Sequence, residues 1–198
     1  DWERVVAHEP VEAAEGDREA AVLVPVVSRP DGAHLLFTKR ADHLGEHPGQ
    51  MSFPGGGHEP ADGTLEATAK REAFEEVGLD PDDAEVVGRL DDIPTVSNYS
   101  VRPFVARIPD REYVPYEGEV AEIAVLSVAD LTDPDNYESE RREHPFYGDV
   151  RIHYFRVDGY TVWGATGRML VQFLELATDW RMPPEADRVV DPDAEYPV

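Results

Sequence analysis

Apolar residues gather in short runs with the length of β-strands, and the first two runs predict a pair of strands joined by a turn. Residues 20–27 (AAVLVPVV) are continuously apolar, and residues 33–40 (AHLLFTKR) return after a Pro30-Asp31-Gly32 turn. Pro25 lies inside the first run. Because proline has no N–H to donate, it indicates an edge strand or a bulge at this point.

The remaining pattern mixes further strands with helices, which predicts an α/β fold in a single domain covering residues 1–180. Residues 181–198 are acidic and contain Pro183-Pro184, so we expect a loose C-terminal tail. Strands are expected at 84–87, 88–93, 101–108 and 120–127, a hairpin at 150–163, an amphipathic helix at 167–180, and short helices within 1–17 and after 127.

A second helix is expected to end at Gly78, and it carries the most unusual charge pattern of the chain. At about 100° per residue, Glu72, Glu75 and Glu76 fall within an arc of about 100° on one face. Three carboxylates this close repel one another, so they face open water or a bound cation, and hard cations such as Mg²⁺ prefer all-oxygen sites. A solvated acidic face is the alternative. The apolar residues Ala67, Ala73, Phe74 and Val77 on the other half of the helix argue that it packs on a core.

Composition narrows the function classes. The chain has 42 acidic and 18 basic residues, a net charge of −24 and no cysteine. The charge argues against binding nucleic acid through a basic surface, and the missing cysteines exclude disulfides, thiolate zinc sites and a cysteine nucleophile. Acidic residues spread through a chain with only two lysines, Lys39 and Lys70, resemble the composition of halophilic proteins.

No apolar run approaches the ~18 residues that a membrane span requires. The chain opens at Asp1 rather than methionine and shows no secretory signal there. We therefore expect a cytoplasmic protein without membrane association. The sequence leaves open whether it acts as a homodimer.

The segment at 55–79 (GGGHEPADGTLEATAKREAFEEVGL) resembles the Nudix box, and residues 71–79 fit that pattern without exception. The resemblance implies an α/β/α sandwich with a mixed β-sheet and a metal-dependent diphosphate hydrolase acting on a small nucleotide derivative. It implies that Mg²⁺ or Mn²⁺ binds Glu72, Glu75 and Glu76, and that a carboxylate accepts a proton from the attacking water. A further catalytic carboxylate is expected among Glu117, Glu119 and Glu122, with Glu119 favoured.

By the same resemblance, residues near the three glutamates are expected to orient them or to bind the substrate. Arg71 is expected to form an orienting salt bridge with Glu75 one turn away, rather than to bind phosphate. Gly55 and Gly56 would let the backbone approach metal and phosphates. Arg40 is a candidate substrate-binding residue.

The flanking motifs are similar to the coenzyme A pyrophosphatase branch of the family. They comprise residues 36–41 (LFTKRA), Gly49, residues 53–56 (FPGG) and residues 163–166 (WGAT). The general box expects an acid where this chain has Gly63, whereas the branch has a longer loop, matched here by Glu59 and Asp62. The implied reaction splits coenzyme A or acyl-CoA into 3′,5′-ADP and 4′-phosphopantetheine.

One departure leaves other substrates open. The branch expects an arginine at the position of Gly45, and Arg40, His43 or His47 would have to supply the missing charge. Hydrolysis of ADP-ribose or nucleoside triphosphates is one alternative. A nucleotide sensor without catalysis is another, against which the complete glutamate set argues.

Two further interpretations concern histidines and aromatic residues. His43, His47 and His58 do not share a helix-face spacing, so loop polarity is a better interpretation than metal ligation. Trp163 and the strand residues Tyr154 and Phe155 are expected in the core.

The charge generates the first testable prediction. Raising KCl from low to molar concentration is expected to raise the thermal unfolding midpoint, because salt screens repulsion within a chain of net charge −24. Circular dichroism melts across a KCl series measure this. A flat or falling midpoint would mean that the acidity has another cause.

Overall fold

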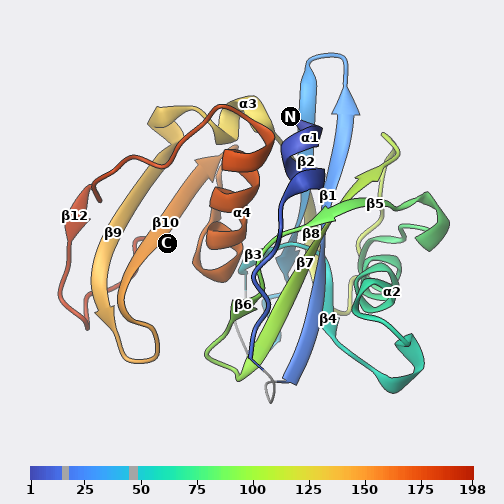
Figure 1. Cartoon of the computed structure of the whole chain (residues 1–198), viewed down its shortest axis with the longest axis horizontal. Helices are drawn as coiled ribbons and strands as arrows, with labels where there is room; N and C mark the ends of the chain where they lie inside the picture. Colours follow the sequence, from blue (N-terminus) through green and yellow to red (C-terminus); the bar gives the residue numbers. More distant parts are fainter. Residues whose placement is uncertain (15–17, 45–48) are drawn as a thin grey trace.

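The computed structural model describes residues 1–14, 18–44 and 49–198. Within them two β-sheets are separated by a helix, and a further helix covers the outer face of the larger sheet (Figure 1). The helices are α1 (Trp2–Ala7), α2 (Leu65–Val77), α3 (Val128–Leu131) and α4 (Gly164–Ala177), with short 3₁₀ turns at Pro60–Asp62, Pro81–Asp83 and Pro134–Asn136. The strands are β1 (Arg18–Arg29), β2 (Gly32–Arg40), β3 (Met51–Ser52), β4 (Gly55–Gly57), β5 (Glu85–Arg89), β6 (Ile93–Pro94), β7 (Tyr99–Ile108), β8 (Val120–Ser127), β9 (Tyr137–His144), β10 (Gly148–Val157), β11 (Tyr160–Val162) and β12 (Arg188–Val189).

The larger sheet is mixed, which confirms the expected α/β fold. Strand β1 lies at its centre, parallel to β7 along ten residue pairs and antiparallel to β2 and β4. The main path runs β3-β2-β1-β7-β5, with β8 pairing along β2. The continuous apolar run of the sequence is explained by this position, since a central strand is covered on both faces.

Pro25 does not mark an edge strand, so the edge-strand part of that expectation was wrong. Leu23 donates its N–H to Pro54 on the β4 side, and strand alternation directs the nitrogen of Pro25 to the same side. On that side β1 pairs with β4 through Val22 and with β2 from Val26 onward. The proline therefore lies where the strand changes partners and no ladder bond is lost.

The two faces of the larger sheet carry different layers. Helix α2 packs on one face through Ala69, Ala73 and Val77, while α1, α4 and the smaller sheet lie on the other side (Figure 1). Phe74 was expected on the packed side of α2, but its side chain is 56% exposed and does not pack on the sheet. The small size of the buried alanines brings α2 close to the strands, which matters for the site below.

The smaller sheet has the order β11-β10-β9-β12, and its strand β9 was not predicted. Its sequence, YESERREH, has no apolar alternation that would indicate a strand. Glu140 and Arg142 are nevertheless buried, and they form a 2.7 Å ion pair that satisfies both charges inside the sheet. The burial depends on this pairing, which a hydrophobic pattern does not reveal.

The C-terminal residues are not a loose tail, which corrects that expectation. Strand β12 pairs in parallel with β9, and Arg151 donates to the carbonyls of Pro183 and Glu185. Arg142 donates to the carbonyl of Ala194 at 2.6 Å. Arginines of the smaller sheet therefore bind the backbone of an acidic segment.

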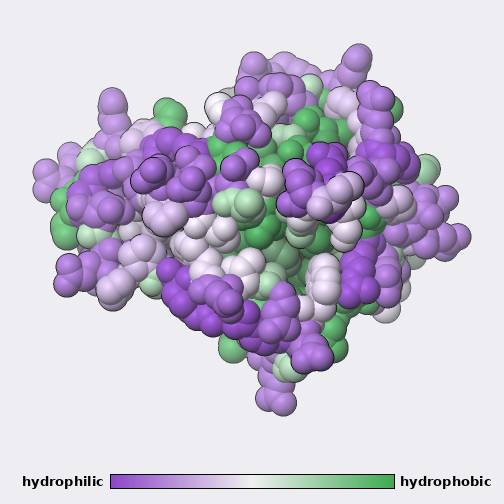
Figure 2. Space-filling view, turned by 90° about the horizontal axis from the view of Figure 1, so that it is seen from above, coloured by the Kyte–Doolittle hydropathy of each residue, from purple (hydrophilic) through white to green (hydrophobic). Residues whose placement is uncertain are grey.

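Hydrophilic residues cover much of the face shown in Figure 2, with apolar residues between them near its middle. In the part of the chain that the structure describes, no helix has the length and apolar character needed to cross a membrane.

Candidate active site

Helix α2 ends at Gly78 as the sequence predicted, and both of its ends are capped. Thr64 Oγ1 accepts the N–H of Ala67 at 3.1 Å, as an N-cap residue does. Gly78 ends the helix in the left-handed region at φ 71°, a conformation that glycine adopts without strain. The fixed length of α2 determines which carboxylates face β4.

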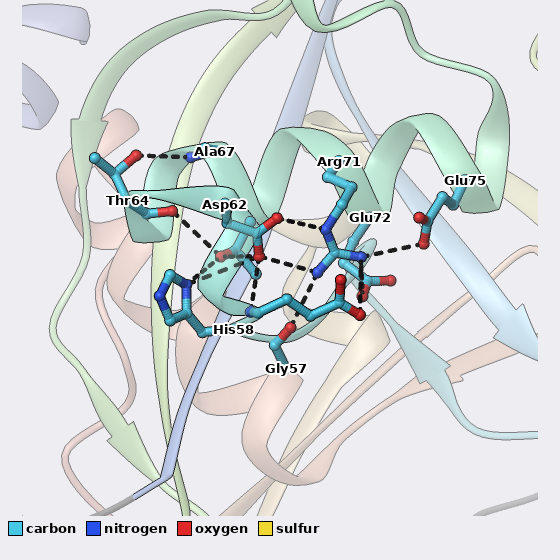
Figure 3. A network of polar contacts seen from close by, with 10 residues as sticks. Gly57, His58, Asp62, Thr64, Ala67, Arg71, Glu72 and Glu75 are labelled. Atoms are coloured by element: carbon cyan, nitrogen blue, oxygen red, sulfur yellow. Dashed lines mark hydrogen bonds and ion pairs between the residues drawn. The ribbon is translucent and has the colours of Figure 1, made fainter.

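The bond network around Arg71 ties the helix to the preceding loop (Figure 3). Its Nε donates to Asp62 Oδ1 at 2.6 Å and its Nη2 to Asp62 Oδ2 at 3.1 Å, a bidentate pair. The Arg71 guanidinium holds the pKa of Asp62 well below its usual range. Nη2 also donates to the Gly57 carbonyl at 3.1 Å, so one guanidinium joins loop, β4 and α2.

The loop acid is Asp62, one position before Gly63. Its Oδ2 also accepts the Thr68 hydroxyl at 2.8 Å and the N–H of Glu59 at 2.9 Å, and its side chain is only 3% exposed. Gly63 follows with φ 75° and lets the backbone turn toward the helix.

The expected salt bridge between Arg71 and Glu75 is present, with Nη1 to Oε2 at 3.3 Å. The same Nη1 also donates to Glu72 Oε1 at 3.0 Å, so the arginine orients two glutamates (Figure 3). Glu75 is 53% exposed and lies on the solvent side of the site, whereas Glu72 is 15% exposed.

Glu72 and Glu76 are the partly buried members of the set. Burial raises the pKa of Glu76 from 4.5 to about 8, although its Oε2 accepts the Gly55 N–H at 2.8 Å. Burial also raises the pKa of Glu72, against the effect of Arg71 and with a further rise from Glu75 and Glu119. The Glu119 carboxylate adds to the raised pKa of Glu76 too, so it lies within electrostatic reach of both.

Among the other candidate residues, Arg40 lies near Glu76, because its charge opposes the rise in the Glu76 pKa. Glu122 is paired with Lys39 at 3.3 Å and with the Tyr160 hydroxyl at 3.0 Å, away from the glutamates of α2. Of the carboxylates expected to add to the site from this region, Glu119 is the one whose charge acts on Glu72 and Glu76.

The histidines of the described loops have protein partners. His58 Nδ1 hydrogen-bonds with the Thr68 hydroxyl at 2.7 Å, and His43 Nε2 with the Gly118 carbonyl at 3.1 Å. His47 and Gly45 lie outside the described residues.

The described residues contain no group of three or more carboxylates and imidazoles already converging on one point. Glu72 is turned toward Arg71, and Glu76 toward the backbone of β4. The donors nevertheless fit a hard divalent cation, because they are all oxygen. Burial first, and then repulsion by neighbouring carboxylates, raises the pKa of Glu72 and Glu76, and a bound cation would oppose both effects. Gly56 also fits, since a Cβ there would lie 2.6 Å from the Glu72 carboxyl carbon.

Two clefts meet beside this cluster. The larger, of about 660 Å³, is lined by Gly56 and Gly57 and extends to Tyr99, Trp163 and Tyr196. The smaller, of about 390 Å³, lies between Lys39 and Tyr160 and shares Gln50 and Trp163 with the larger. Trp163 is thus a half-buried cleft residue and not the core residue that was expected, whereas Tyr154 and Phe155 are fully buried as expected.

The aromatic residues of the larger cleft were missed by the sequence analysis. Tyr99 lies on β7, Tyr147 in the turn between β9 and β10, and Tyr196 in the C-terminal segment, so they stand in no common motif. Only Trp163 carried a signal, through the WGAT segment.

Comparisons with known proteins place the chain in a family. Residues 17–146 match the family model described as NUDIX domain. A protein of Enterobacter sp. (strain 638) named "Uncharacterized Nudix hydrolase NudL" is 38% identical over 77% of this chain and 79% of its own length. A protein of the same name from Cronobacter sakazakii is 40% identical over the same shares.

Solved structures show the same fold at low sequence identity. A NUDIX hydrolase from Nitrosomonas europaea covers 90% of this chain and 81% of its own, with a TM-score of 0.57 and 14% identity. The Nudix hydrolase RenU from M. Smegmatis covers 61% of this chain and 76% of its own, with a TM-score of 0.50 and 23% identity.

The three glycines of β4 predict a graded substitution series. A Cβ on Gly55 would lie 2.4 Å from the Ala21 carbonyl oxygen and 2.7 Å from Val22 Cα, whereas one on Gly57 has ordinary contacts at 3.8 Å. Gly55→Ala is expected to lower the free energy of unfolding by about 1–3 kcal/mol, the typical range for overpacking. Gly56→Ala is expected to displace the flexible Glu72 carboxylate, leaving stability nearly unchanged and weakening Mn²⁺ binding.

Urea unfolding and Mn²⁺ titration followed by electron paramagnetic resonance measure the two effects, with Gly57→Ala as the matched control. Equal Mn²⁺ affinity in the Gly56→Ala and Gly57→Ala variants would contradict the assigned position of Glu72.

Glu76 predicts a pH dependence of stability in metal-free buffer. Its folded pKa of about 8 lies above the usual 4.5. The contribution of protonated Glu76 to the free energy of unfolding is therefore fully present below pH 4.5 and is lost as pH rises toward 8. Glu76→Gln keeps an acceptor for the Gly55 N–H and does not ionise. The variant is expected to match the wild type near pH 5 and to exceed it by about 2–4 kcal/mol near pH 9, at about 1.4 kcal/mol per pKa unit.

Urea unfolding in EDTA at several pH values tests this. The control is Glu75→Gln, which changes a carboxylate that is 53% exposed on the same helix. Parallel pH profiles of wild type and Glu76→Gln would show that Glu76 is not the group whose ionisation opposes folding.

Proposed function

This chain belongs to the Nudix hydrolases and is a pyrophosphohydrolase; from that premise we propose that it cleaves the diphosphate of coenzyme A or an acyl-CoA, using Mg²⁺ or Mn²⁺. The observation that carries the proposal is the placement of two α2 carboxylates against the glycine strand β4. Glu76 accepts the Gly55 N–H at 2.8 Å, and a Cβ on Gly56 would lie 2.6 Å from the Glu72 carboxyl carbon. Mutual repulsion among these carboxylates favours binding of a divalent cation.

We assign different roles to the residues of the site. Glu72 and Glu76 would hold the ion, and Glu75 or Glu119, both exposed, would complete its ligands or accept a proton from water. When bound, Mg²⁺ or Mn²⁺ neutralises diphosphate charge and polarises a water molecule. Arg71 holds Glu72 and Glu75 in place before the substrate arrives, and Arg40 adds positive charge near Glu76.

Gly55 and Gly56 support the approach of the diphosphate from the side of β4. A side chain on either residue would meet β1 or Glu72, so both positions keep the strand free of side chains. The Gly55 N–H is already committed to Glu76, which fixes that carboxylate against the strand.

The choice of coenzyme A rests on the flanking motifs and on the loop. Asp62, the acid of the longer loop, accepts two hydrogen bonds from Arg71. The loop length typical of the coenzyme A branch therefore places an acid where it contacts this arginine. ADP-ribose and nucleoside triphosphates remain the alternative substrates of the same chemistry. A sensor without catalysis is disfavoured. Burial makes ionisation of Glu72 and Glu76 unfavourable, and a protein that only recognises a nucleotide would have no need to keep two such carboxylates.

Product analysis after incubation with coenzyme A and Mg²⁺ tests the proposal. The expected products are 3′,5′-ADP and 4′-phosphopantetheine, separated by liquid chromatography, with ADP-ribose and nucleoside triphosphates as parallel substrates. Glu76→Gln is expected to lower the rate at least about a hundredfold, since the lost charge stabilisation is worth several kcal/mol and each 1.4 kcal/mol is tenfold.

Cleavage of ADP-ribose without cleavage of coenzyme A would overturn the substrate and keep the chemistry. Near-normal turnover by Glu76→Gln at saturating Mg²⁺ would overturn the metal assignment.

A further inference from the structure

The larger cleft is continuous with the carboxylate cluster through one residue. Gly56 lines the cleft with its backbone, and a Cβ on the same residue would meet the Glu72 carboxylate. A substrate whose diphosphate lies at Glu72 would therefore extend one arm into this cleft. Its volume of about 660 Å³ lies within the range of small-molecule sites, about 300–1,000 Å³.

The lining of the cleft has the chemistry of a site for an aromatic ring. Tyr99, Tyr147, Trp163 and Tyr196 contribute rings, and Gln50 and Thr95 contribute polar groups. None of the described residues that line it is acidic, although acidic residues outnumber basic ones by 42 to 18 in the whole chain. An uncharged planar group attached to an anionic diphosphate fits this lining better than a cation does.

Tyr196 reaches the cleft from the C-terminal segment. Its ring centroid lies 5.0 Å from that of Trp163, the residue immediately before α4. The Arg142 guanidinium carbon lies 4.1 Å from the Tyr196 centroid, and the tyrosine remains 37% exposed. The ring is thus held by two neighbours and is still accessible.

The segment that carries Tyr196 is anchored by arginines of the smaller sheet. Arg142 is buried, pairs with Glu140 at 2.7 Å and donates to the Ala194 carbonyl at 2.6 Å. Arg156 donates to the Pro197 carbonyl at 2.7 Å. The backbone is therefore fixed on both sides of Tyr196, which lowers the ordering cost of binding.

We infer that Tyr196 is a substrate-binding residue that, with Trp163, stacks on the nucleobase of a nucleoside diphosphate derivative. Arg142 is the positioning residue that holds Tyr196 at the cleft. The match to the family model ends at residue 146, so Arg142 lies inside the matched region and Tyr196 lies outside it. The inference rests on the proposed function for the site of the diphosphate, and it adds the residue that selects the base.

Calorimetric binding of 3′,5′-ADP and of inorganic pyrophosphate tests this without requiring catalysis. The variants are Tyr196→Leu, which keeps apolar bulk, Tyr196→Phe, which keeps the ring, and the control Val189→Ala, at a residue 79% exposed on β12. Tyr196→Leu is expected to weaken 3′,5′-ADP binding about five- to a hundredfold, the usual effect of losing one base-stacking ring. Pyrophosphate binding should stay within about twofold, and the Phe and control variants should behave as wild type.

Unchanged 3′,5′-ADP affinity in Tyr196→Leu, an equal loss for pyrophosphate, or no nucleotide binding by the wild type would each overturn the inference. Thermal midpoints of all variants identify a variant that fails to fold, in which case Tyr196→Ala replaces Tyr196→Leu. Hydrolysis assays separate the two proposals. If the wild type does not cleave coenzyme A but binds 3′,5′-ADP in a Tyr196-dependent way, the substrate proposal fails and the role of Tyr196 stands.

Discussion

The bidentate bond between Arg71 and Asp62 is the contact on which the arrangement of the site depends. It joins a loop residue that is 3% exposed to the middle of α2, and the same guanidinium also reaches the Gly57 carbonyl and the Glu72 carboxylate. Because a buried charged pair is costly to break, loop, strand and helix are held as one unit. Glu72 and Glu75 are positioned by this unit and not by the helix alone.

The second constraint is the closeness of α2 to β4. Ala69 and Ala73 let the helix lie near the sheet, and glycines on β4 leave room for carboxylates between them. The resulting burial opposes ionisation of Glu76 and Glu72, a cost that a divalent cation would offset. Packing and chemistry are therefore linked, since any larger residue along this contact would move the carboxylates.

The smaller sheet begins with β9 inside the region that matches the family model and continues beyond residue 146 with β10, β11 and β12. Its core includes a paired Glu140 and Arg142, and its arginines hold the acidic C-terminal residues by their backbone carbonyls. These bonds go to neutral backbone carbonyls, so they fix an acidic segment without requiring its carboxylates as partners. They also bring Tyr196 to the cleft beside Trp163.

The sequence by itself determined the α/β fold, the end of α2 at Gly78 and the family, because periodicity, a helix-ending glycine and a local motif depend only on nearby positions. Only the tertiary structure decided that Pro25 lies in a central strand and that the C-terminal segment packs on β9. It also brought Glu119 to the glutamates of α2 and Tyr196 to Trp163. The physical reason is that partners far apart in the chain neutralise charges and supply backbone bonds, and no local pattern encodes those partners.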